Sequence, residues 1–205
     1  VQTCALPISM TPYAEIHKLL PAHTLVLEFK DENQARPETS RYWSLPYLPK
    51  SKLSFGQACE EIRELLTEAV RLRMISDVPL GAFLSGGVDS STVVALMQAQ
   101  SSRPVKTFTI GFNEEGYNEA VHAKAVARHL GTDHTELYVT AEQARAVIPR
   151  LSTIYDEPFA DSSMIPNYLV CQAARQWVTV AMSGIGGDEL FAGYERYRGA
   201  DRKST

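Results

Sequence analysis

Over most of this chain, short apolar runs alternate with amphipathic segments of helical period, and this alternation limits the possible folds more than any other feature. Runs of four to six residues suit buried strands, whereas apolar residues at i, i+3, i+4 and i+7 form one face of a helix. Strands alternating with helices pair in parallel, with right-handed crossovers that cover both faces of the sheet. We therefore predict an α/β fold with a doubly wound parallel sheet. The strand-like runs are 81–84, 105–110, 134–139 and 177–182, and the helical stretches are 58–78, 89–100, 119–130, 141–155 and 162–176.

Local signals refine the helical stretches. The first stretch has an apolar stripe with charged residues between its members, so a core-facing helix is expected there. Gly131 stands where a helix would stop, and Pro149 interrupts a later helix. The stripe consists of Ile62, Leu65, Leu66, Ala69 and Val70.

The composition is that of a globular protein with its own core. Hydrophobic residues make up 44% of the chain and charged residues 21%, which excludes disordered and collagen-like classes. The net charge is −4, so the basic surface of a nucleic-acid-binding protein is not indicated and no nucleic-acid partner is expected. No apolar run approaches the ~18 residues of a membrane span, and no signal peptide is recognisable. We expect a cytoplasmic protein without a membrane partner.

Three cysteines, Cys4, Cys59 and Cys171, lack the pairing of a disulfide framework or a zinc site, which agrees with a reducing cytosol. Cys59 and Cys171 lie in helical patterns and are expected to pack as small apolar residues. The five histidines show no metal-ligand spacing.

The two ends of the chain differ in character from its middle. Residues 1–9 and 201–205 resemble translated sequencing adaptors, so we expect both segments to be adaptor-derived or disordered and the chain to be a fragment. Residues 10–52 are β-rich at 23–29 and then pass through a polar connector broken by Pro37, Pro46 and Pro49. They are predicted to be the end of a preceding domain plus a linker, and 53–200 a second, truncated domain.

A glycine-rich loop at 85–91 follows one predicted strand and opens a helix. Its glycines let the backbone approach an anion, while helix N–H groups and the hydroxyls of Ser85, Ser90 and Ser91 supply donors. The loop lacks the Walker and dinucleotide spacings. Because a carboxylate repels phosphate unless a divalent cation bridges them, Asp89 indicates Mg²⁺. The alternative is that Asp89 simply caps its own helix.

A second loop at 183–189 repeats this arrangement after a later strand. Ligands of a doubly wound sheet lie at the carboxyl ends of neighbouring strands, where the strand order reverses. Asp188 is therefore expected to join Asp89 on one metal ion. The alternative is a glycine-rich turn with a solvated acidic pair.

Five segments in order resemble the synthetase domain of the glutamine-hydrolysing asparagine synthetases, a family of N-type (PP-loop) ATP pyrophosphatases. The resemblance implies a fold of the adenine nucleotide alpha hydrolase type, and it implies that 10–52 is the end of a glutaminase domain. It also implies that ATP adenylates the side chain of aspartate, releasing pyrophosphate, and that ammonia then gives asparagine and AMP. The matching segments are 84–91, 108–112, 127–134, 156–163 and 183–194.

The resemblance also implies roles for single residues. Backbone at Leu84 and Ile110 would hold adenine, although both side chains could equally be core residues; Ser183 and Gly184 would lie near the ribose and α-phosphate. ATP and Mg²⁺ are the implied cofactors, with aspartate and glutamine-derived ammonia as partners and a homodimer as one option for the assembly. Pyrophosphate would be held by Ser85, Gly86, Gly87, Ser90 and Ser91, and Mg²⁺ by Asp89 and Asp188.

Ile185 departs from the family pattern, because relatives usually carry an acid at this position. An aliphatic side chain cannot exchange a proton with an incoming amine. Either another carboxylate is adenylated, or a nearby acid such as Glu157, Asp161 or Glu189 takes over.

Other parts of the family pattern are not found here. The glutaminase nucleophile, an N-terminal cysteine, and a later lysine have no counterpart in the sequence, so the isolated chain is expected to be inactive. An RNA-modifying ATP pyrophosphatase and a nucleotide-binding remnant without turnover remain as alternatives.

Overall fold

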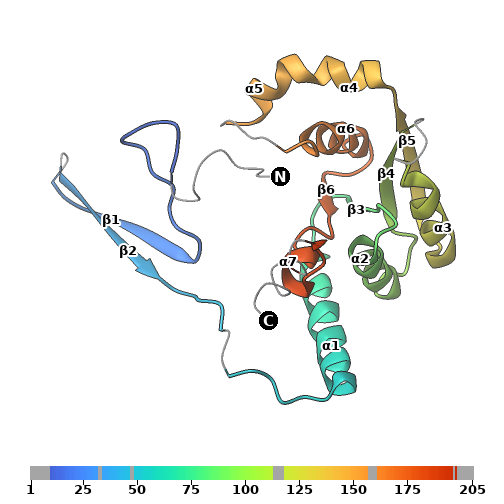
Figure 1. Ribbon diagram of the computed structural model, residues 1–205, viewed down its shortest axis with the longest axis horizontal. Helices are drawn as coiled ribbons and strands as arrows, with labels where there is room; N and C mark the ends of the chain where they lie inside the picture. Colours follow the sequence, from blue (N-terminus) through green and yellow to red (C-terminus); the bar gives the residue numbers. More distant parts are fainter. Residues whose placement is uncertain are drawn as a thin grey trace. The chain divides into compact units, whose positions relative to one another are not determined.

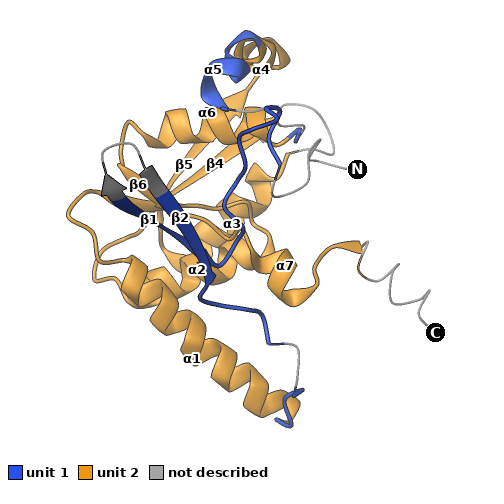
Figure 2. Ribbon diagram, turned by 90° about the vertical axis from the view of Figure 1, so that its left-hand side faces the viewer, with its two compact units in different colours: residues 1–53, 149–162 blue, residues 54–148, 163–205 orange. Residues whose placement is uncertain are grey.

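The computed structural model describes residues 10–31, 34–46, 49–112, 118–156, 161–195 and 197. The chain divides into two compact units (Figure 2), Val1–Leu53 with Pro149–Ser162, and Ser54–Ile148 with Ser163–Thr205. Within the described residues, no helix has both the length and the apolar character needed to cross a membrane.

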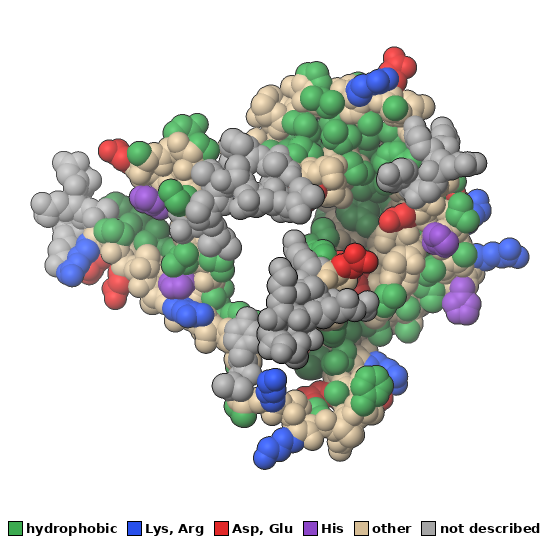
Figure 3. Space-filling view, viewed as in Figure 1, with side chains coloured by type: hydrophobic (Ala, Val, Ile, Leu, Met, Phe, Trp, Pro, Cys, Tyr) green, Lys and Arg blue, Asp and Glu red, His purple; other side chains and the backbone are tan. Residues whose placement is uncertain are grey.

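The first unit contains an antiparallel hairpin of β1 (His23–Asp31) and β2 (Gln34–Arg41). The strand predicted at 23–29 is confirmed. Pro37 was expected in a polar connector, but it lies within β2 opposite Leu27. A two-stranded ribbon has only edge strands, and an edge strand tolerates a residue without an N–H group. Hydrophobic side chains are spread over the ribbon in Figure 3, and Leu25, Val26, Leu27 and Phe29 are all exposed.

The second unit is built on a parallel sheet in the order β5-β4-β3-β6. The predicted α/β fold with a parallel sheet is confirmed. The strands are β3 (Leu80–Phe83), β4 (Lys106–Phe112), β5 (Asp133–Val139) and β6 (Val180–Met182).

The last strand is shorter than the predicted run 177–182. The amides of Trp177 and Val178 both donate to the Ala174 carbonyl, at 2.9 Å each, so they complete the end of a helix. Pairing starts only after Thr179 donates to the Pro79 carbonyl. An apolar run does not reveal whether its first residues close a helix or open a strand.

Helices cover both faces of the sheet (Figure 1), with α2 (Val88–Ala99) and α3 (Ala120–Leu130) on one face and α6 (Met164–Ala174) on the other. Because successive side chains of a strand point to opposite faces, β3 contributes to two cores. Ala82 packs with Val94, Met97 and Ala123 in one core, whereas Phe83 packs with Phe108, Val170, Ala174 and Val178 in the other.

The helix-ending signals are confirmed. Gly131 caps α3 in the left-handed region at φ 72°. The stretch with Pro149 divides into α4 (Ala141–Val147), a 3-10 turn (Ile148–Arg150) and α5 (Leu151–Ile154). The short helix α7 (Gly187–Phe191) follows β6 in the chain.

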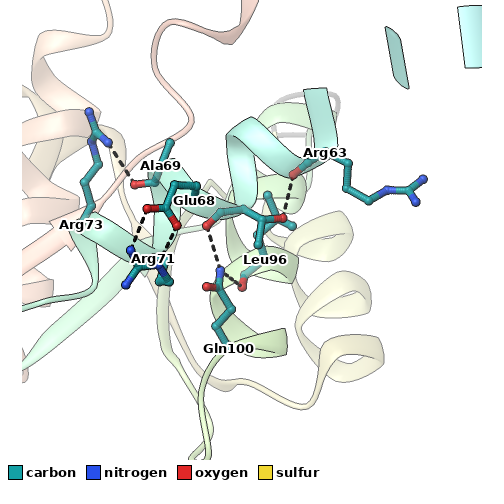
Figure 4. A network of polar contacts seen from close by, with 8 residues as sticks. Arg63, Glu68, Ala69, Arg71, Arg73, Leu96 and Gln100 are labelled. Carbon is teal, nitrogen blue, oxygen red and sulfur yellow. Dashed lines mark hydrogen bonds and ion pairs between the residues drawn. The ribbon is translucent and has the colours of Figure 1, made fainter. Parts of the chain in front are cut away.

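The expected core-facing stripe of α1 (Phe55–Arg73) is only partly correct. Val70 is buried, but Ile62 is 38% and Leu65 63% exposed. At 1.5 Å per residue, α1 is about 28 Å long and α2 about 18 Å, so α1 is too long for α2 to cover all of it. Gln100 fixes the contact near the end of α1: its Nε2 donates to the Thr67 carbonyl at 3.2 Å (Figure 4).

Candidate functional site

The candidate site lies where the strand order changes direction. The chain leaves β3 toward β4 and β5 on one side, whereas β6 pairs with β3 on its other side. Loops after β3 and β6 therefore leave neighbouring strands at the same edge of the sheet, in opposite directions. Such a reversal is where open α/β sheets bind ligands. We call residues 84–87 the first loop and residues 183–186 the second loop.

Serine hydroxyls hold the first loop in shape. The Ser85 amide donates to Ser90 Oγ at 3.2 Å, and the two hydroxyl oxygens share a hydrogen bond at 2.9 Å. Ser90 Oγ in turn donates to the Gly87 carbonyl at 3.3 Å, and the Gly87 amide donates to Ser85 Oγ, also at 3.3 Å. Gly86 has φ 84°, which favours glycine. These bonds fix the loop before α2, whose first N–H groups have no partner within the helix.

The first turn of α3 supports the first loop from behind. A Cβ built on Gly86 would lie 2.6 Å from the Ala123 amide nitrogen and 2.7 Å from His122 Cβ. Only a glycine therefore permits this approach. This contact with α3 cannot be predicted from the sequence, because the spacing of residues along the chain does not show that two helix starts meet.

The second loop has a similar internal bond. The Ile185 amide donates to Ser183 Oγ at 3.1 Å, and Gly186 is left-handed at φ 100° before α7 begins. The Ile185 side chain is 86% exposed. An exposed aliphatic side chain at a loop tip offers contact area to a neighbour but no proton.

The second loop meets the first turn of α2, and the start of α7 meets the Asp89 side chain. A Cβ built on Gly184 would lie 2.7 Å from the Ser90 amide nitrogen, and a Cβ built on Gly187 would fall on the Asp89 carboxylate. Asp89 therefore lies beside the start of α7, against the residue that precedes Asp188. Asp89 is thus close to the residue before Asp188 in the chain, whereas the Asp188 carboxylate itself lies against Gly193. Their metal binding stays a prediction.

The donor set suits a metal ion that arrives with phosphate. Asp89 and Asp188 are half-buried, and neither carboxylate has an ion-pair partner in the described ranges. Groups of three or more His, Cys, Asp or Glu side chains able to hold a metal are absent from the same ranges. Mg²⁺ is usually held by one or two carboxylates plus phosphate oxygens and water, so a pair of carboxylates fits it.

The side chains of Leu84 and Ile110 pack in the core, so only their main-chain groups are available at the edge of the site. Leu84 is 1% exposed, and Ile110 packs against the Phe108 cluster. The Leu84 amide donates to the Phe108 carbonyl at 2.9 Å. Alternate residues of a strand turn their amides toward the same neighbour, so the Ile110 amide points past the end of β3. No hydrogen bond joins it to the Leu84 carbonyl in the described part of the chain. This edge can accept the rim of a flat base, and the adenine contact stays a prediction.

The remaining predicted residues are placed as follows. Ser91 Oγ is buried without a hydrogen-bond partner among the described residues, a group that a bound ligand or an ordered water commonly satisfies. Of the three substitute acids, Glu189 accepts a hydrogen bond from the Tyr194 hydroxyl at 2.8 Å, and Asp161 is half-buried. Glu157 lies outside the described residues.

Known proteins resemble this chain in sequence. The family model described as asparagine synthase matches residues 61–205. A Methanocaldococcus jannaschii protein assigned by name as a glutamine-hydrolyzing asparagine synthetase is 42% identical over 194 residues, covering 92% of this chain and 36% of its own length. The amidase chyE of Penicillium rubens is 32% identical over 211 residues, covering 93% of this chain and 30% of its own length. This chain therefore spans about a third of the length of these relatives.

Among solved structures, an NH3-dependent NAD synthetase from Campylobacter jejuni is similar with a TM-score of 0.43 and 14% identity, over 69% of this chain and 61% of that chain.

Proposed function

The chain belongs to the asparagine synthase family, and on that premise we propose that it carries the ATP-binding face of a ligase that adenylates the side-chain carboxylate of aspartate. Pyrophosphate leaves in this step. Ammonia derived from glutamine then attacks the acyl-adenylate to give asparagine and AMP. The observation that supports this reaction best is the close approach of Gly184 to the first turn of α2 and of Gly187 to the Asp89 carboxylate, which sets Asp89 beside the start of α7.

The first loop is proposed to bind the pyrophosphate part of ATP. The hydroxyls of Ser85 and Ser90 hold the loop in shape, whereas the buried Ser91 hydroxyl has no partner among the described residues and can donate to a ligand. Together with Gly86 and Gly87, these serines are proposed to bind the pyrophosphate. N–H groups at a helix start favour a negative charge through hydrogen bonds and the helix dipole. Because the hydroxyl network already fixes the loop, these donors need little reorganisation as charge grows on the leaving group.

Asp89 and Asp188 are proposed to hold Mg²⁺. When bound, the metal ion would neutralise charge on the departing pyrophosphate. Ser183 and Gly184 would lie near the ribose and α-phosphate, since Gly184 already touches the first turn of α2. The main chain of Leu84 and Ile110 would hold the adenine edge.

The proposal extends to the rest of the protein. Residues 10–52 are proposed to be the end of a glutaminase domain with a linker, and 53–200 the synthetase domain. The separation of Val1–Leu53 from the sheet-containing unit supports this division. A cytoplasmic location is proposed because the cysteines show no disulfide pattern.

A second candidate is a related amide-forming enzyme that adenylates a carboxylate other than that of aspartate. Ile185 favours it, because an 86% exposed aliphatic side chain stands at the tip of the second loop. Such a side chain would suit an acceptor with an apolar body.

The test is Mg²⁺-dependent exchange between ATP and radiolabelled pyrophosphate, catalysed by the protein expressed from its complete gene. Aspartate should stimulate exchange. Stimulation by a different carboxylate supports the second candidate, stimulation by tRNA supports an RNA-modifying enzyme, and no exchange with any acceptor argues for nucleotide binding without turnover.

Carboxylate variants sharpen this test. Asp89→Asn and Asp188→Asn should each lower exchange on the order of a hundredfold or more, because a metal ion contributes several kcal/mol to stabilising the leaving group. Asp77→Asn is the matched control, since Asp77 is exposed and lies on neither α2 nor α7. Equal rates in all three variants would contradict the proposed metal site.

A further inference from the structure

A partly buried chain of polar side chains joins β4 to β5 away from the two loops. Thr107 Oγ1 lies 2.9 Å from Thr132 Oγ1 and 2.9 Å from His134 Nδ1. Thr107 and His134 are partners in the register of the two strands, near the amino end of each. Thr107 is fully buried. Nε2 of His134 is also buried, and it has no hydrogen-bond partner among the described residues.

Counting protons assigns the form of His134. The Thr107 hydroxyl has one proton to donate and can also accept a hydrogen bond. If it donated to Nδ1, the neutral imidazole would carry its proton on Nε2 and leave a buried donor unsatisfied. If Nδ1–H donates to Thr107 instead, the Thr107 hydroxyl can donate to Thr132, and only a lone pair remains on Nε2. Because an unsatisfied buried donor is costly, the neutral Nδ1–H form fits this site.

A second proton on His134 would have to sit on Nε2. The new N–H group would then be charged, buried and without an acceptor in the described structure. Lys124 on α3 adds repulsion. Glu136 on β5 adds attraction, but its carboxylate already binds Lys124 Nζ at 2.8 Å and accepts from the Tyr138 hydroxyl at 3.0 Å.

The net shift in the pKa of His134 has the direction that burial gives it. Desolvation lowers the pKa of His134, an effect larger than the opposing attraction of Glu136. The ion pair between Lys106 and Asp133, at 2.8 Å, joins the same two strands one position earlier and stays outside this balance, because both side chains are partly in water.

We propose that Thr132, Thr107 and His134 form an acid-sensitive latch that holds the edge strand β5 on β4. Above the pKa of a histidine in the unfolded chain, about 6.5, His134 is neutral in both states and the latch is intact. Below this pH, the His134 imidazole binds a proton in the unfolded chain but not in the folded chain. The equilibrium constant for unfolding therefore rises as the pH falls, by up to about tenfold per pH unit, until the folded chain is protonated as well.

The test is the pH dependence of chemical unfolding of the whole chain between pH 7.5 and 5. His134→Asn keeps an N–H donor near the position of Nδ1 but does not titrate. Below pH 6.5, the equilibrium constant for unfolding should rise less steeply in this variant than in the wild-type chain, by up to about tenfold per pH unit. His129→Asn makes the same change at an exposed position on α3 and should keep the wild-type rise. If His134→Asn keeps the rise too, His134 is not the source of the acid sensitivity and the proposal is wrong.

A spectroscopic measurement covers the case in which His134→Asn does not fold. Long-range 1H–15N spectra of the wild-type imidazole should show a proton on Nδ1 at pH 7.5 and a midpoint of titration below 6.5. A proton on Nε2 at pH 7.5, or a midpoint at or above 6.5, would overturn the proposal.

Discussion

The two loops of the candidate site share one local design but differ in what surrounds them. In each, a serine follows the strand and accepts the amide of the second residue after it, Gly87 for Ser85 and Ile185 for Ser183. The first loop leads into α2, a helix of 12 residues that buries Ser90, Val94 and Met97. The second loop leads into α7, which has 5 residues and no buried side chain.

This difference assigns different mechanical roles to the loops. The first loop is tied by hydroxyls, supported by the first turn of α3 and continued by a helix anchored in the core. The second loop is held by close backbone approach of Gly184 to Ser90. A preformed part and a docked part are therefore combined in one site. We expect variants of the first loop to affect the fold and those of the second to affect mainly the contact between the loops.

The largest difference is expected between the two helices. Met97→Ala removes a side chain that is 1% exposed and should lower the free energy of unfolding by about 2–5 kcal/mol. Leu190→Ala on α7 removes a side chain that is 74% exposed, and it should change the free energy of unfolding by under about 0.5 kcal/mol. Urea unfolding measures both. Similar losses would mean that α7 is as firmly anchored as α2.

Glycine variants should separate backbone strain from crowding. Gly86→Ala and Gly186→Ala both place a side chain at positive φ, which costs about 1–2 kcal/mol. Only Gly86→Ala also meets backbone atoms, those of His122 and Ala123, whereas Gly186 faces open space. Because of overpacking, Gly86→Ala should lower the free energy of unfolding by about 1–3 kcal/mol more than Gly186→Ala does. Urea unfolding measures this difference. Equal losses in the free energy of unfolding would contradict the role of α3 in supporting the first loop.

The smallest difference is expected between the serines. Ser90→Ala removes the hydroxyl that binds Ser85 and Gly87 and leaves partly buried groups unsatisfied, which should cost about 1–3 kcal/mol. Ser183→Ala loses one hydrogen bond that water can replace on a half-exposed loop, so about 0.5–1.5 kcal/mol is expected. A larger loss from Ser183→Ala would reverse the assignment of the preformed part.

The elements that sequence predicts well are those with a strong local signal. The stop at Gly131 and the break at Pro149 depend on backbone properties of one residue, and both are confirmed. The glycine loops after β3 and β6 are also recognisable, because few residue types permit such backbones. The order β5-β4-β3-β6 was not predicted, because the rules of chain connection permit it without selecting it.

The failures have a common cause, which is that a local pattern does not contain its partners. The spacing of Ile62 and Leu65 predicts an apolar face but not whether another element covers it. Pro37 reads as a breaker until the partner strand shows that β2 lies at an edge. Trp177 could close α6 or open β6. The approach of the 183–189 segment to Asp89 was expected, but the sequence does not reveal that Gly187 makes the contact.

The late position of β6 in the chain affects how the protein emerges from the ribosome. β6 pairs with β3, although β4, β5 and the helices α2 to α6 lie between the two in sequence. Closing a segment of ~100 residues costs roughly 4 kcal/mol of chain entropy. At about 5–20 residues per second, β3 would wait roughly 5–20 s for its neighbour during translation. Throughout that interval the nascent sheet has an unprotected edge at β3, where a chaperone would act or a second chain would add.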